Sequence, residues 1–312
     1  ELTFSSNKAV HAEKVLVKNV SNAKEIRFDW SGYEDFEIFE VSQIYCTLNV
    51  NSCEHTIFID HEAMANDGNS QYIFENISLA GRMYIDVDHG PNSTFNDITI
   101  DHAGGQNEAL LLQGLRGNST VYLSNITLSL AQSSTYQGLE TNVIYSDLIF
   151  SNLDVQGFAN KQVEISSNAC STCTITFQNS TISNGSSNNE WGIYSSSSAL
   201  MILDNTTVSH NANNPSVTKT YQTGGIYSQN LIIKNSNISN NYYFQNTASY
   251  SGLQTSDIDC YGIKSGNLLE IHNSIIANNC VRTLVTNSYY VDSIHTSGVD
   301  YWDNYCSGST SE

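Results

Sequence analysis

A short repeated unit, apolar-x-Asn-x-x-apolar, constrains the fold of this chain more than any other feature of its sequence. Two copies are FSNLDV, from Phe150 to Val155, and FQNSTI, from Phe177 to Ile182. The central residue recurs at steps of 21, 28, 27, 27, 26, 30 and 38 residues, at positions Asn76, Asp97, Asn125, Asn152, Asn179, Asn205, Asn235 and Asn273. Such a recurrence is typical of repeat proteins, in which each unit packs against its sequence neighbours.

Each repeat has the pattern of short β-strands that meet at the asparagine. Segments such as VYLS at Val121 and LIIK at Leu231 alternate in polarity, and a third strand is expected upstream, as in GIYS at Gly192. Asparagine suits the junction because it tolerates a left-handed backbone and hydrogen-bonds nearby groups. The pattern predicts an all-β solenoid with an internal, inward-pointing asparagine ladder, formed by Asn125, Asn152, Asn179, Asn205, Asn235 and Asn273.

With these asparagines at the tight turn between second and third strands, the sequence resembles the pectate-lyase-like superfamily of right-handed parallel β-helices. The resemblance covers about residues 70 to 280 and implies a right-handed parallel β-helix. It implies no single activity, because the superfamily holds lyases, hydrolases, epimerases, phage tailspikes, adhesins and surface structural proteins. Another β-solenoid or a β-propeller is the alternative architecture.

The chain is expected to form one β-helix domain over residues 1–312. Residues 1–70 are expected to form irregular N-terminal coils or a cap, residues 71–280 the regular coils, and residues 281–312 a C-terminal cap and tail. Alternatively, one end stays open and stacks on another subunit. No segment approaches the roughly 18 apolar residues of a membrane-spanning helix, so no membrane span is expected.

The charge balance excludes one class of partner. The chain has 31 acidic and 12 basic residues, a net charge of −19, and yet only 14% of its residues are charged. Because affinity for nucleic acid needs a phosphate-neutralising surface, we expect no nucleic-acid binding. Disorder is excluded as well, since 39% of the residues are hydrophobic and only two are proline.

Seven cysteines indicate an oxidising, extracellular or cell-surface location. We expect disulfides within loops, although the pairing does not follow from the sequence. The candidate pairs, formed from close neighbours or from residues most of a coil apart, are Cys46 with Cys53, Cys170 with Cys173, and Cys260 with Cys280. Cys306 remains without an assigned partner. Cys170 and Cys173 form a CxxC, but a second CxxC and the βαβ context of thioredoxins are both missing, which favours a loop disulfide over metal or redox chemistry.

The dipeptide Asp-His occurs three times and follows an apolar residue each time. The pairs are Asp60-His61, Asp88-His89 and Asp101-His102. Gathered from neighbouring coils, these side chains could bind a divalent metal such as calcium, with Asp86, Glu62 and Glu54 as further oxygen ligands. The alternative is that they are polar turn residues on an acidic surface. No cofactor is otherwise required.

No catalytic residues are assigned from the sequence. Asp-Asp, Gly-His-Gly and Arg-x-Lys, which the resemblance would lead one to seek in a polygalacturonase, do not occur. The arginines that a pectate lyase would use as a base are dispersed, and only Arg82 and Arg116 lie near the Asp-His region. Paired carboxylates from different coils need no sequence signature, so hydrolysis stays open.

Nine Asn-x-Ser/Thr sequons are present. They lie at Asn19, Asn76, Asn92, Asn118, Asn125, Asn179, Asn184, Asn205 and Asn237. Those at ladder positions Asn125, Asn179 and Asn205 are expected to point inward and to be unavailable for glycosylation. The loop sequons Asn92, Asn118 and Asn184 are the expected acceptors.

The sequence favours a non-enzymatic extracellular or cell-surface protein, either an adhesin or a fibre or filament subunit, that uses the β-helix as a stiff rod. Its expected partners are copies of itself, stacked end to end, or a carbohydrate or host-surface ligand. The alternative is a carbohydrate-active β-helix, a polysaccharide lyase or glycoside hydrolase. An enzyme should gather three or more charged groups in a groove on the upstream strands. The residues expected to face outward there, Tyr194, Tyr227 and Lys264, suit sugar stacking or packing against a neighbour.

Overall fold

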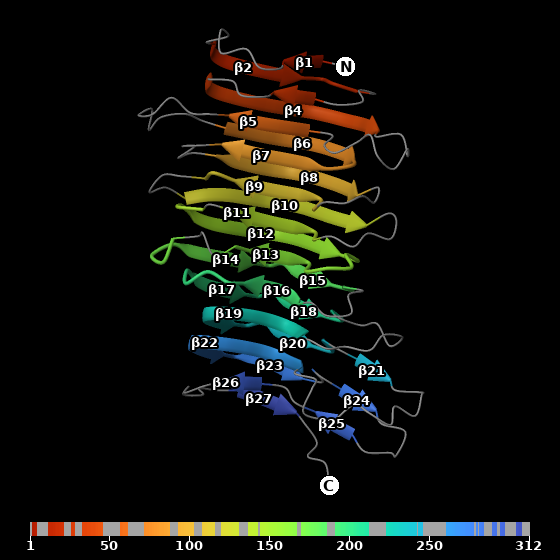
Figure 1. Cartoon of the computed structure of the whole chain (residues 1–312), viewed down its shortest axis with the longest axis vertical. Helices are drawn as coiled ribbons and strands as arrows, with labels where there is room; N and C mark the ends of the chain where they lie inside the picture. Colours follow the sequence, from red (N-terminus) through yellow and green to blue (C-terminus); the bar gives the residue numbers. More distant parts are fainter. Residues whose placement is uncertain are drawn as a thin grey trace.

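The repeats stack as successive coils of a parallel β-solenoid, which runs from the N-terminus at the top of Figure 1 to the C-terminus at its bottom. This computed structural model describes residues 2–4, 12–21, 26–28, 33–45, 57–61, 72–87, 93–102, 108–115, 120–130, 137–142, 144–166, 170–185, 191–211, 223–241, 243–245, 260–277, 279, 281–283, 289–291, 294–296 and 304–307. No helix occurs in these ranges, and hence no helix that could cross a membrane. The parallel pairing of consecutive coils excludes a β-propeller.

Each coil contributes to three parallel sheets. The first sheet holds the upstream strands β1 (Leu2–Phe4), β3 (Ile26–Phe28), β5 (Ile57–His61), β7 (Met83–Val87), β9 (Leu110–Gln113), β11 (Leu139–Asn142), β13 (Val163–Ile165), β16 (Trp191–Ser195), the starts of β19 (Thr223–Lys234) and β22 (Cys260–His272), and β26 (Ile294–Thr296).

The second sheet holds the strands that lead to the corner asparagine, and the third sheet those that leave it. The second sheet comprises β2 (Ala12–Lys18), the starts of β4 (Tyr33–Tyr45), β6 (Tyr72–Ala80), β8 (Thr94–His102), β10 (Thr120–Leu130) and β12 (Asp147–Gln156), then β14 (Thr174–Gln178), β17 (Leu200–Asp204) and the ends of β19 and β22. The third comprises the ends of β4, β6, β8, β10 and β12, then β15 (Thr181–Ser183), β18 (Thr207–Ser209), β20 (Asn237–Ser239), β23 (Ser274–Ala277) and β27 (Asn304–Ser307).

The parallel ladder continues into both terminal segments. In the N-terminal segment β2 pairs with β4 and β4 with β6, with a register shift between Val41 and Ile44. In the C-terminal segment β26 and β27 pair with β22 and β23 and so extend the coils. A separate sheet joins β21 (Tyr243–Gln245), β24 (Val281–Thr283) and β25 (Tyr289–Val291).

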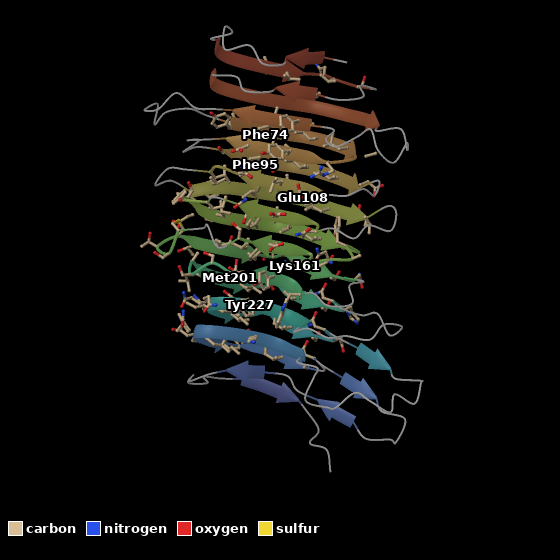
Figure 2. All side chains as sticks on the ribbon, viewed as in Figure 1. Phe74, Phe95, Glu108, Lys161, Met201 and Tyr227 are labelled. Carbon is tan, nitrogen blue, oxygen red and sulfur yellow. A yellow bond between two sulfur atoms is a disulfide. The ribbon has the colours of Figure 1, made fainter. Side chains whose placement is uncertain are left out.

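The parallel register of the coils places side chains of the same kind on top of one another in the core. Inward residues two positions before each corner are all buried: Phe74, Phe95, Leu123, Phe150, Phe177, Leu203, Ile233 and Ile271. Phe74 stacks on Phe95 with 4.8 Å between ring centroids, as their labels in Figure 2 show, and Phe150 stacks on Phe177 at 4.9 Å. Offset stacking at this distance adds to the free energy of apolar burial.

The predicted ladder asparagines occupy the corner between second and third sheets. All six, together with Asn76 and Asp97, have left-handed φ between 46° and 56°. Their side chains are exposed, so the expectation that they point inward is wrong. The left-handed residue shifts the inward–outward alternation of side chains along the strand by one position. Ser124 and Asn125 both face away from the core, and Ile126 then faces inward.

The amides of the corner ladder pair along the outside of the solenoid. Three amide nitrogens donate to the asparagine of the preceding coil, from Asn152 to Asn125 at 2.9 Å, from Asn205 to Asn179 at 2.7 Å, and from Asn273 to Asn235 at 2.9 Å, while Asn235 donates to Asp204 Oδ1 at 3.0 Å. Between Asn152 and Asn179 the structure contains no such bond. The ladder is therefore interrupted.

A second, buried asparagine ladder lies at the corner after the third sheet, and sequence reasoning missed it. It consists of Asn211, Asn241 and Asn279. Asn241 Nδ2 donates to Val208 O at 2.8 Å and to Asn279 Oδ1 at 2.9 Å, while Asn241 Oδ1 accepts from the backbone and side-chain nitrogens of Asn211. The repeated Asn at the end of each repeat, three residues after Val208, Ile238 and Ile276, was its signal.

Glycines near the start of two first-sheet strands, Gly192 in β16 and Gly225 in β19, make room for the buried ladder. A Cβ at Gly225 would lie 2.8 Å from Asn241 Nδ2 and 2.5 Å from Gly262 O. A Cβ at Gly192 would lie 2.6 Å from Asn211 Nδ2. The Gly-Ile pair and the terminal Asn of the repeat are therefore two parts of one packing arrangement.

Replacement of Asn241 by alanine should lower the free energy of unfolding by about 2–4 kcal/mol, because it leaves several buried polar groups without partners. Urea unfolding followed by circular dichroism measures this loss. The control is Asn152→Gly at the exposed corner, where glycine tolerates the left-handed backbone and the expected loss is below about 1 kcal/mol. Equal losses in the two variants would contradict the assignment of the buried ladder as the more stabilising one.

Candidate charged column on the first sheet

The outward face of the first sheet carries one column of residues in register. From N- to C-terminal coils the column contains Phe58, Tyr84, Leu111, Glu140, Glu164, Tyr194, Tyr227 and Lys264. They share one column because each is the register partner of the next across parallel strands. We call this set the first-sheet column.

Two ion pairs flank the middle of the column. Arg82 and Glu108 form a buried pair, in which Arg82 Nε also donates to Glu108 O at 2.7 Å. Glu164 accepts from Lys161 Nζ at 2.9 Å and from Gln137 Nε2 at 2.7 Å. In Figure 2, Glu108 and Lys161 are labelled on coils that are separated by the coil of β11. Charge-assisted hydrogen bonds of this kind stabilise the ionised form of a carboxylate.

Glu140 lies between these two pairs and has no hydrogen-bond or ion-pair partner among the described residues. Its pKa is raised from 4.5 to about 7, first by burial, then by the charges of Glu108 and Glu164, against the opposite effect of Lys161 and Arg82. Glu140 is thus a half-buried carboxylic acid that holds a proton up to about neutral pH. A group with such a pKa beside an ionised carboxylate is suited to proton transfer.

The tyrosines of the column have their ring faces covered. Tyr194 and Tyr227 stack at 5.0 Å, Lys161 Nζ lies 4.6 Å from the ring centroid of Tyr194, and Lys264 Nζ lies 5.9 Å from that of Tyr227. These distances fit cation–π contacts. A sugar therefore cannot stack on the faces between them, which favours packing within the column over the sugar stacking considered from the sequence.

Sequence reasoning missed the charged residues of this face. The sequence patterns place Arg82 near the Asp-His region and do not single out Glu108, Lys161 or the two carboxylates Glu140 and Glu164. Glu140 and Glu164 each follow the first residue of a short alternating strand, LETN or VEI. An alignment of those upstream strands would have placed the two carboxylates one above the other. The face therefore gathers more than the three charged groups that we expected of an enzyme.

The Asp-His residues are divided between different sheets. Asp60 and His61 end β5 in the first sheet, Asp101 and His102 end β8 in the third, and Asp88 and His89 lie outside the described residues. Exposed Asp101 accepts from Ser129 Oγ at 3.0 Å. Of the proposed additional ligands, Asp86 Oδ2 accepts from Gln113 Nε2 at 2.8 Å, while Glu54 and Glu62 are not described. In the described part of the chain, no three potential ligands come together as a metal site.

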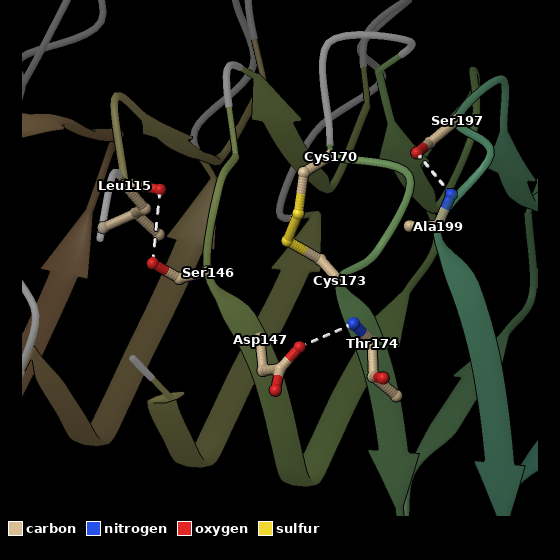
Figure 3. Close-up of a disulfide and its surroundings, with 8 residues drawn as sticks. All are labelled: Leu115, Ser146, Asp147, Cys170, Cys173, Thr174, Ser197 and Ala199. Carbon is tan, nitrogen blue, oxygen red and sulfur yellow. Dashed lines mark hydrogen bonds between the residues drawn. A yellow bond between two sulfur atoms is a disulfide. The ribbon is translucent and has the colours of Figure 1, made fainter. Parts of the chain in front are cut away.

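One cysteine pair is joined. Cys170 and Cys173 form a disulfide in the turn before β14, and Cys173 is buried at the end of the core (Figure 3). The backbone nitrogen of Cys170 donates to Ile144 O at 2.8 Å, and Asp147 Oδ1 accepts from the nitrogen of Thr174 at 2.7 Å, which fixes both ends of the turn. Cys46, Cys53 and Cys280 lie outside the described residues, and the side chains of Cys260 and Cys306 are not described.

Of the three expected glycosylation sites, only Asn184 is described. It is exposed at a left-handed corner, with φ 57°, and its Nδ2 donates to Ser183 Oγ at 3.2 Å. Asn92 and Asn118 lie outside the described residues.

Comparison with protein-family models, with curated proteins and with solved structures finds no match. The parallel β-helix assignment rests on the strand pairing of the chain itself.

The raised pKa of Glu140 predicts a pH dependence of stability. The folded chain keeps the proton up to about pH 7, whereas the unfolded chain releases it near 4.5, so this group makes the fold less stable as pH rises between those values. Glu140→Gln should match the wild type near pH 4 and exceed it by roughly 1–3 kcal/mol at pH 8 in urea unfolding.

Glu164→Gln is the matched control. It removes an ionised carboxylate that accepts two hydrogen bonds, so it should be less stable than the wild type at pH 8. If the difference between Glu140→Gln and the wild type were the same at every pH, Glu140 would not carry the proposed proton.

Proposed function

We propose that the protein is a non-enzymatic extracellular or cell-surface component, an adhesin or a fibre subunit, whose β-helix serves as a stiff rod. The observation that carries the proposal is the continuous parallel register, in which eight successive corners repeat a left-handed residue, asparagine at seven of them and Asp97 at the other. Hydrogen bonds between coils run along the rod axis, and the two asparagine ladders add side-chain bonds in the same direction. Bending such a rod would stretch many of these bonds at once.

The column of covered tyrosines supports the same proposal. Tyr194 and Tyr227 stack on each other, Lys161 and Lys264 lie over their rings, and Tyr227 OH accepts from Gln229 Nε2 at 3.1 Å, so these side chains contact one another within the rod. Kinship to the pectate-lyase-like superfamily, of its adhesin or surface-structural kind, is part of this proposal. The proposed partners are further copies of the chain, end to end, or a carbohydrate or host-surface ligand.

A fibre subunit should assemble when its charge is screened. Each copy carries a net charge of −19, so filaments seen by negative-stain microscopy should lengthen as salt is raised from about 10 to 150 mM. Sedimentation velocity on the same samples measures the mass of the assemblies. If only monomers are found at high protein concentration and 150 mM salt, the protein is not a fibre subunit, and the adhesin alternative remains.

A second candidate, a carbohydrate-active β-helix, is favoured by the protonated Glu140 beside the ionised Glu164. The backbones of these two residues are in register on adjacent strands, which lie about 4.8 Å apart in a β-sheet, so their side chains leave the sheet side by side. Two carboxyl groups about 5 Å apart are the arrangement of retaining glycosidases, in which one donates a proton to the leaving oxygen and the other attacks the sugar. Glu140 would be the proton donor and Glu164 the nucleophile.

If this second candidate holds, the wild type should release reducing ends from a neutral polysaccharide with retention at the anomeric carbon. Glu140→Gln should lower kcat by about 10²–10⁴-fold, because the proton donor is lost. The control is Glu270→Gln, which changes a carboxylate on the second sheet and should leave the rate unchanged. No product from the wild type across a panel of neutral and acidic polysaccharides would rule this candidate out.

A further inference from the structure

Three of the ladder asparagines that begin sequons, Asn125, Asn179 and Asn205, face solvent instead of the core. Each lies at the convex corner between second and third sheets, with left-handed φ of 50° to 54°. A folded secreted protein can carry an N-linked glycan only where the amide faces solvent. Burial therefore does not prevent glycosylation at these three asparagines.

The three amides differ in how their nitrogen is used. Asn125 Nδ2 donates to Asn96 Oδ1 at 3.2 Å and to Asp97 Oδ1 at 2.9 Å, so both of its hydrogens have acceptors. Asn205 Nδ2 donates to Asn179 Oδ1 at 2.7 Å. Asn179 Nδ2 donates no hydrogen bond to any described residue, because the ladder is interrupted between Asn152 and Asn179.

We propose that Asn179 is an N-glycan acceptor at the interruption of the corner ladder. A sugar replaces one hydrogen of Nδ2 and leaves Oδ1 untouched. The bond that Asn179 Oδ1 accepts from Asn205 is thus retained, and no bond of the ladder is lost. At Asn125 the same modification removes one existing bond.

The neighbouring sequon is then left unmodified. Thr181 pairs in register with Thr207, so Asn179 and Asn205 lie on adjacent coils, about 4.8 Å apart. Two branched glycans do not fit side by side at this spacing. A glycan on Asn179 therefore excludes one on Asn205 and lies across the coil from the first-sheet column.

The test is secretion of the full chain, behind an added signal peptide, from a eukaryotic cell line, with glycopeptide mapping by mass spectrometry. Asn179 should be occupied in the wild type and in Thr181→Ser, which keeps the sequon. Thr181→Ala removes the sequon without changing Asn179, so the glycan should be lost there and occupancy at Asn205 should rise. Unglycosylated wild type and Thr181→Ala from bacteria should melt within a few degrees of each other, which verifies folding.

An unmodified Asn179 in the folded, secreted wild type would overturn the proposal. Glycans on Asn179 and Asn205 in the same molecule would overturn the exclusion between them. The biological relevance of the site rests on the extracellular location in the proposed function. Because secretion is imposed in this experiment, a failure of the site and a failure of the proposed location are distinguishable.

Discussion

Parallel pairing between coils places each residue directly above its counterpart in the next coil, and most other features of the structure depend on this stacking. It puts phenylalanine on phenylalanine in the core and asparagine on asparagine at both corners. Stacked rings and amides attract one another, since each amide both donates and accepts. A sequence with a period near 27 residues therefore gains the same favourable contact in each coil.

The same register is unfavourable where the stacked residues are acidic. Glu140 and Glu164 are adjacent in the first-sheet column, and Glu108 lies near them. Arg82 and Lys161 neutralise Glu108 and Glu164, and the proton that Glu140 retains removes the remaining charge. In a chain of net charge −19, these five groups concentrate positive and negative charge on one face. The two functional candidates differ in whether this face only stabilises the rod or also transfers a proton.

The two asparagine ladders have different physical roles. The corner ladder depends on the backbone, since its left-handed residue turns the chain and its amide bonds are exposed to water. The buried ladder depends on side-chain hydrogen bonds, because Asn241 satisfies backbone groups that water cannot reach. Buried bonds of this kind are costly to break, whereas an exposed ladder tolerates the interruption next to Asn179.

The all-β solenoid, its period and the positions of its corners follow from the sequence alone. They do so because the corner needs a residue that accepts a left-handed backbone and the strands on either side need alternating apolar residues. The packing of the coils was needed to show that the corner amides point outward, that Asn211, Asn241 and Asn279 form the inner ladder, and that Glu140 lies between two ion pairs. Those outcomes depend on which side chains meet across coils and how much water they exclude. The first-sheet strands are short and separated by loops of unequal length, so their register was not visible in the sequence.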